Sequence, residues 1–172
     1  MPSDPEREIA TRDTWKALPA GPMASFTYGA TFSDAEYDAI RRGLIPHEME
    51  DKWFIFWEAD TLYIHRSWTG ACIYQIAFRV SPSGVEVAQA AVAAGSEHYR
   101  RRSDVEEAAL VDFLIRGLLL HQTVPFPVPA EVAGRYPPGT YQAHVTGTGA
   151  PERTIASPGD RWLTRVKRAF GF

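Results

Sequence analysis

The sequence has one cysteine, three methionines and no long uninterrupted apolar run. The single cysteine, Cys72, excludes an internal disulfide and a zinc site built from several cysteines, and it fits a reducing compartment. The longest apolar stretch, residues 110–120, is interrupted by Asp112 and Arg116 and is shorter than the roughly 20 residues that span a bilayer. The first residues lack the apolar segment of a secretory signal. We therefore expect a cytoplasmic protein without a membrane span.

A large charge excess is also missing. The chain carries 18 Lys and Arg against 21 Asp and Glu, for a net charge of −3. Such a chain has no general attraction to nucleic acid or to an anionic membrane, so we expect no DNA partner. The acidic run His47-Glu48-Met49-Glu50-Asp51 does not have the HExxH spacing of a zinc-binding helix. We expect neither a metal site nor a cofactor.

What the sequence does contain, in residues 52–92, is a series of apolar strands separated by turn residues. Strands are predicted at about 52–58, 61–68, 71–80 and 85–92. Capping boxes at Ser33-Asp34-Ala35-Glu36 and Ser103-Asp104-Val105-Glu106 each predict a helix start, and the second helix is expected to run about 17 residues to near His121. The fold class is α+β: a four-stranded antiparallel meander with helices packed on one face.

Four segments are predicted along the chain. An N-terminal arm covers residues 1–30, with a short helix near 14–18, and the α+β core domain covers 31–122. A Pro/Gly-rich segment follows over 123–157, in which 141–145 can form one short strand. The remaining residues, 158–172, form an amphipathic, basic C-terminal helix, with Pro158 at its first position.

Turn length fixes which side chains share a face of the sheet. A two-residue turn at Ala59-Asp60 sets Trp53 opposite Arg66 and Ile55 opposite Ile64. A two-residue turn at Thr69-Gly70 sets His65 opposite Tyr74 and Ser67 opposite Cys72. The third turn sets Arg79 opposite Glu86, a favourable pair of charges.

Both resulting faces are apolar, although a free sheet face is normally polar. One face collects Phe54, Phe56, Tyr63, His65, Cys72, Tyr74, Ile76 and Phe78, and we expect the second helix to pack on it. The other collects Trp53, Ile55, Trp57, Leu62, Ile64 and Arg66. Two Trp side chains among Leu and Ile form an unusual patch for an exposed surface, so this face needs a cover.

The second face and the turn beside it hold the candidate ligand-binding residues. Arg66 can bind a phosphate or carboxylate, and Trp68 can stack on a base. Arg66 can equally stack on Trp53 across the strand pair, with Thr69-Gly70 serving only as a turn. The full set of candidates is Trp53, Trp57, Arg66, Trp68, Thr69 and Gly70.

The candidate catalytic residues are His65, Tyr74 and Cys72. His65 beside Tyr74 can act as an acid–base pair, or the two can be hydrogen-bonded core residues. Cys72 has His65 on the same predicted face, as a cysteine nucleophile requires, but cysteine is also a common small core residue. The sequence leaves these alternatives open and contains no complete catalytic motif.

The strings Glu50-Asp51-Lys52-Trp53-Phe54-Ile55 and Leu62-Tyr63-Ile64-His65-Arg66-Ser67-Trp68-Thr69-Gly70, followed by Cys72-Ile73-Tyr74, resemble a small bacterial domain family. The resemblance covers about 90 residues, from Phe32 to His121. Some members are associated with ADP-ribosylglycohydrolases, so the resemblance implies a link to ADP-ribose by association. The chain lacks the acidic metal-ligand set of that hydrolase, and its activity is not carried over.

Together these patterns predict a small bacterial binding or regulatory module. Its ligand would be a protein partner or an anionic nucleotide-like molecule such as ADP-ribose. The alternative is an enzyme acting on a nucleotide or an ADP-ribosyl group. A homodimer that buries the tryptophan face is a third possibility.

Overall fold

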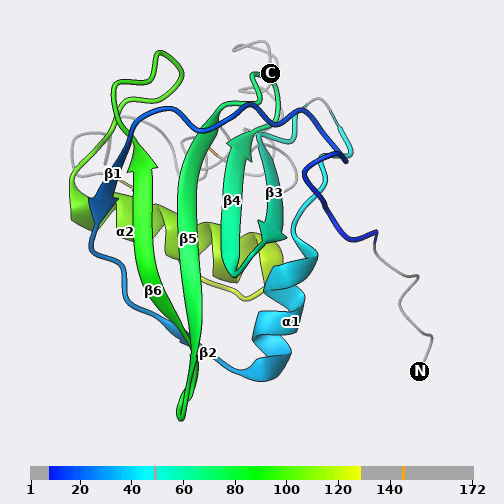
Figure 1. Cartoon of the computed structure of the whole chain (residues 1–172), viewed down its shortest axis with the longest axis vertical. Coiled ribbons are helices and arrows are strands. Elements are labelled where there is room, and N and C mark those ends of the chain that lie inside the picture. The colour runs from blue at the N-terminus through cyan, green and yellow to red at the C-terminus, as the bar shows by residue number, and fades with distance from the viewer. Residues whose placement is uncertain (1–7, 49, 129–144, 146–172) are drawn as a thin grey trace, which may run out of the picture.

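A computed structural model describes residues 8–48, 50–128 and 145 of the chain. Its centre is an antiparallel meander of four strands: β3 (Trp53–Glu58), β4 (Thr61–Arg66), β5 (Cys72–Ser81) and β6 (Gly84–Ala93). Helices complete an α+β fold (Figure 1). The predicted fold class and the four strands of the meander are therefore confirmed.

Two short strands that the sequence pattern did not predict extend the sheet to six. β1 (Met23–Phe26) and β2 (Thr31–Phe32) both pair antiparallel with β6, and the main order is β1-β6-β5-β4-β3. These strands have four and two residues, too few to show a period of two in sequence. They form because the outer edge of β6 offers unpaired backbone groups.

Both predicted capping boxes are present. Helix α1 (Asp34–Arg42) starts at Ser33, and helix α2 (Asp104–Phe113) starts at Ser103, each with the reciprocal bonds to the Glu three residues later. Gly43 ends α1 with a φ of +70°, where a Cβ atom would lie 2.2 Å from the Ile55 carbonyl oxygen. This close approach needs glycine, and it brings Leu44 into a backbone bridge with Ile55 at the β3 edge.

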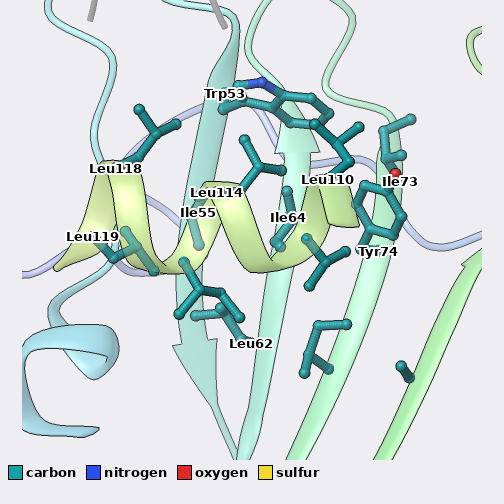
Figure 2. Packing of buried hydrophobic residues seen from close by; sticks show 14 of the residues in the cluster. Trp53, Ile55, Leu62, Ile64, Ile73, Tyr74, Leu110, Leu114, Leu118 and Leu119 are labelled. Carbon is teal, nitrogen blue, oxygen red and sulfur yellow. The ribbon is translucent and has the colours of Figure 1, made fainter. Parts of the chain in front are cut away.

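The second helix continues as a π-helix, η1 (Leu114–Leu119), and the two cross one face of the sheet (Figure 1). Figure 2 shows Leu110, Leu114, Leu118 and Leu119 between the helix and the strands, against Trp53, Ile55 and Ile64. These apolar contacts form the main core. The helix is buried along its sheet side because leucines recur at helical spacing through both segments.

The prediction that this helix packs on the Phe54 face is wrong, because the helix covers the Trp53 face. The error comes from the β4–β5 register. The structure pairs Ile64 with Tyr74 and His65 with Cys72, so Ile73 is the extra residue of a β-bulge. Tyr74 and the alternate residues beyond it therefore join the Trp53 face, which gives that face the larger apolar surface.

The opposite face is covered by residues 9–18, here called the strap. Ala10 is buried with Phe54 and Phe56, and Ala17 and Tyr63 pack beside them. The strap is not helical: Leu18 N–H donates to the Gly70 carbonyl oxygen at 2.9 Å instead of bonding within a helix. The short helix expected near 14–18 is thus not formed.

Some predicted elements lie outside the described residues. These are the C-terminal helix over 158–172 and most of the Pro/Gly-rich segment, including the possible strand at 141–145 except for Val145. Val145 is buried, and its carbonyl oxygen accepts a hydrogen bond from Trp53 Nε1 at 3.0 Å. None of the helices in the described part of the chain is long and apolar enough to cross a lipid bilayer.

Candidate functional site

The β4–β5 connection is a five-residue loop, residues 67–71, and not the predicted two-residue turn. Arg66 N–H donates to Ala71 O at 2.9 Å, and Gly70 N–H donates to Arg66 O at 2.9 Å. Gly70 has a φ of +75°, which lets the chain reverse. Thr69 Oγ1 accepts from the Ala71 amide, so Thr69 and Gly70 shape this loop.

Other segments hold the loop in place. Ser67 Oγ donates to Asp51 O at 2.5 Å, and Ser67 N–H donates to Lys52 O at 3.0 Å. On the other side, the Trp15 indole N–H of the strap donates to Ser67 O at 2.8 Å. The residues before β3, the loop and the strap therefore meet at one end of the sheet.

Arg66 lies on β4 directly opposite Trp53 on β3, as the first hairpin register predicts. Its guanidinium carbon lies 4.1 Å from the centre of the Trp53 ring. Arg66 also donates to Val145 O at 3.4 Å. Of the two predicted roles of Arg66, the structure therefore shows the stack on Trp53. This stack positions the guanidinium at the end of β4.

Lys52 lies next to this arginine and was not among the predicted site residues. Its Nζ atom is 5.1 Å from the centre of the Trp68 ring. The pKa of Lys52 is lowered, first by burial and then by the positive charge of Arg66, while Glu50 acts in the opposite direction. We call Lys52, Arg66 and Trp68 the cationic corner. Trp68 is its most accessible member, with 58% of its surface exposed.

The two other predicted tryptophans do not reach this surface. Trp53 is 1% exposed and lies under α2, so its ring cannot stack on a ligand from solution. Trp57 is half-buried at α1, where its indole N–H donates to the Tyr37 hydroxyl at 3.1 Å. The tryptophan face is therefore covered by helices of the same chain, and a homodimer is not needed to cover it.

The bulge separates the three candidate catalytic residues. His65 and Cys72 pair across the strands on the strap side, whereas the Tyr74 ring packs on the helix side. His65 and Cys72 are both buried. Burial raises the pKa of the Cys72 thiol to about 11, which keeps it protonated at neutral pH and a weak nucleophile. The predicted opposition of His65 to Tyr74, on which an acid–base pair depended, is wrong.

Tyr74 instead belongs to a buried polar cluster that the sequence pattern did not predict. Glu107 on α2 accepts hydrogen bonds from the Tyr74 hydroxyl, from the Tyr99 hydroxyl at 2.6 Å and from the Arg102 amide at 2.7 Å. Burial, the nearby tyrosine and the carboxylate charge raise the pKa of Tyr74. The feature of the sequence that could have indicated this cluster is Glu107, an acidic residue on the buried side of a mostly apolar helix.

This cluster and the cationic corner differ in their access to solvent: Glu107 is fully buried, whereas Trp68 is exposed. The cluster is sealed by the core, so its chemistry is structural: three donors satisfy one carboxylate. No three His, Cys, Asp or Glu side chains in the described ranges are grouped so that they could hold a metal ion. The corner can contact a ligand, because it combines two cations with an accessible aromatic ring.

Comparisons with known proteins return no match. The chain matches no protein-family model, no curated protein and no solved structure.

Proposed function

We propose that this protein is a non-catalytic binding module of the bacterial cytoplasm that recognises an anionic, nucleotide-like ligand at the cationic corner. The observation that carries the proposal is the convergence of Lys52 and Arg66 at adjoining strand ends, beside the exposed ring of Trp68. Lysine and arginine side chains bind phosphate groups through charge-assisted hydrogen bonds.

The residue types fit a ligand that carries both a phosphate and a flat ring. The planar guanidinium of Arg66 can donate two parallel hydrogen bonds to a phosphate, and its stack on Trp53 orders it beforehand. Lys52 adds a second positive charge, and the Trp68 ring adds a stacking surface for a base. ADP-ribose has all of these groups, and it is the ligand that the sequence resemblance implies by association.

The enzyme hypothesis has less support. A nucleophile needs a base and an accessible, electropositive setting. Cys72 is a buried thiol with a raised pKa, and Tyr74 lies across the sheet from it. The proposal therefore assigns binding rather than turnover.

Thermal unfolding of the full chain tests the proposal with ADP-ribose, AMP and inorganic phosphate as probes. A ligand present at 100 times its dissociation constant should add about 2.7 kcal/mol to the free energy of unfolding. We expect ADP-ribose and AMP to raise the melting temperature more than phosphate, because only they can use the Trp68 ring. Melting curves unchanged by all three probes would contradict the proposal and favour a protein partner.

Substitutions at the corner locate the site. Trp68→Ala and Lys52→Gln change partly exposed side chains, so they should weaken the ligand-induced shift with little effect on the unliganded protein. Arg79→Gln is the matched control, since Arg79 is an exposed arginine near the β5–β6 turn, paired with Glu86. A shift reduced equally by the control would mean that the ligand responds to total charge and not to the corner.

A further inference from the structure

The strap covers its face of the sheet with few attachments. Its first part is held by a hydrogen bond from the Ala10 amide to Arg42 O at 2.9 Å. Its last part is held at the β4–β5 loop, by Trp15 Nε1 on Ser67 O and by the Leu18 amide on Gly70 O. Most strap side chains remain exposed, including 41% of Trp15. A segment with so little buried surface can open without unfolding the domain.

His65 lies beneath the strap and shares a hydrogen-bond acceptor with it. The histidine is 1% exposed, and its Nδ1 atom lies 2.8 Å from Gly70 O, the same carbonyl oxygen that accepts the Leu18 amide. Since a carbonyl can only accept, Nδ1 carries the proton in the neutral ring. The other nitrogen, Nε2, is buried and has no hydrogen-bond partner among the described residues.

The surroundings of His65 disfavour a positive charge. Its ring stacks on Phe56 at 5.4 Å between centres, with Phe54 at 6.3 Å. Burial lowers the pKa of His65, and the charge of Arg12 lowers it further, against the hydrogen bond to Gly70. Arg12 belongs to the strap and lies over Phe56 and Tyr63.

The other charged and titratable groups around His65 do not reverse this effect. On the elements packed around the ring they are Arg12, Asp13 and Lys16 on the strap, Glu58 on β3, Tyr63 on β4 and Cys72 on β5. Of the two carboxylates, Asp13 is exposed and Glu58 is bound to Arg12 at 2.5 Å. A protonated His65 would thus sit in an apolar layer with the Arg12 cation close to it, and departure of the strap would remove Arg12 and admit water to Nε2.

We propose that the strap is a pH-sensitive cover: protonation of His65 displaces residues 9–18 and uncovers the aromatic face formed by Phe54, Phe56 and Tyr63. The proposal does not depend on which ligand binds at the cationic corner, although the strap also bonds to the loop that carries Trp68. The direction in which pH changes the stability of the closed state follows from the linkage between protonation and opening. A histidine whose pKa is lowered by folding stabilises the closed state above its unfolded pKa of about 6.5, and this contribution is lost as the pH falls.

The single cysteine reports on opening, because Cys72 is buried on the same face and pairs with His65. The experiment measures the reaction rate of Cys72 with 4,4′-dithiodipyridine in the full chain between pH 7.5 and 5.0. Each rate is divided by that of a small free thiol at the same pH, which removes the intrinsic pH dependence of the chemistry. We expect the normalised rate to rise at least tenfold toward pH 5, while the far-ultraviolet circular dichroism remains that of the folded protein.

Two variants distinguish His65 from other groups. His65→Gln keeps a polar side chain of similar size but cannot titrate, so its normalised rate should be flat with pH. His47→Gln, at an exposed position, should keep the unmodified profile. A flat profile in the unmodified protein, or the same rise in His65→Gln, would overturn the proposal.

A second measurement needs no substitution at His65. Nuclear magnetic resonance gives the titration curve of the His65 ring in the unmodified chain, and its midpoint should coincide with the rise in Cys72 reactivity. A histidine that titrates while the thiol stays protected would also overturn the proposal.

Discussion

The two faces of the sheet are both apolar, but they are covered in different ways. Helices α2 and η1 lie across the face that contains Trp53, Ile55 and Ile64, and they supply a continuous row of buried leucines. The strap, which is not helical, covers the face that contains Phe54 and Phe56. Within residues 9–18 only Ala10 is fully buried.

The difference shows that strand residues can be equally buried on two faces although the segments covering those faces differ in the free energy needed to displace them. Phe54 and Ile55 are adjacent in sequence and both are fully buried. The free energy needed to expose each face depends on the apolar area that its cover buries and on the number of bonds that hold the cover. The helix side should therefore open only with global unfolding, while the strap side should open locally.

The largest expected effect compares two tryptophans, one under each cover. Trp53→Ala should lower the free energy of unfolding by about 3–5 kcal/mol, because it removes a buried ring and a hydrogen bond to Val145 O. Trp15→Ala removes a partly exposed ring and one hydrogen bond, and should cost about 1 kcal/mol. Urea denaturation followed by circular dichroism measures both. Equal losses would mean that the strap is as integral to the core as the helices.

A smaller effect is expected at the polar cluster on the helix side. Glu107→Gln keeps the size of the side chain but replaces a charged acceptor of three hydrogen bonds, so we expect a loss of about 2 kcal/mol. Glu106→Gln, on the same turn but only half-buried, is the matched control and retains most of the capping box. The same denaturation experiment measures both variants. An unchanged free energy of unfolding in Glu107→Gln would show that the carboxylate charge does not stabilise the core.

The smallest effect concerns the strap itself. Arg12→Ala removes cation–π contacts with Phe56 and Tyr63 and an exposed ion pair, which together should contribute about 0.5–1 kcal/mol. We expect little change in global unfolding but faster amide hydrogen exchange at Ala10 and Leu18. Arg79→Ala removes an exposed Arg–Glu pair elsewhere in the sheet and should leave that exchange unchanged. Unchanged exchange in Arg12→Ala would show that the backbone bonds alone hold the strap.

Local sequence patterns were sufficient for several elements. The two-residue turn at Ala59-Asp60 and the register of its hairpin were predicted correctly. In the structure both residues adopt the positive φ angles that such a turn requires. The opposition of Arg79 and Glu86 was predicted too, and the two side chains form an ion pair. Both capping boxes start helices as expected. Each of these features depends on residues within one turn or one hairpin.

The errors arose where distant segments decide the outcome. The loop after β4 has five residues, and Trp15 and Asp51, far away in sequence, form hydrogen bonds with its first residue, Ser67. The bulge at Ile73 moved Tyr74 to the helix side, and Lys52 joins Arg66 and Trp68 at a corner of which only Arg66 and Trp68 had been predicted. Sequence spacing carries no record of such long-range bonds, so the site was only partly predictable.

The sequence by itself determined that this chain forms a meander with two apolar faces, since the apolar content of residues 52–80 exceeds what one buried face requires. Which cover lies on which face was decided only by the tertiary structure. One residue inserted in β5 exchanges the faces of all residues on one side of it. The adjoining loop is held by bonds from the strap and from the residues before β3, and no local sequence pattern encodes these contacts between distant segments.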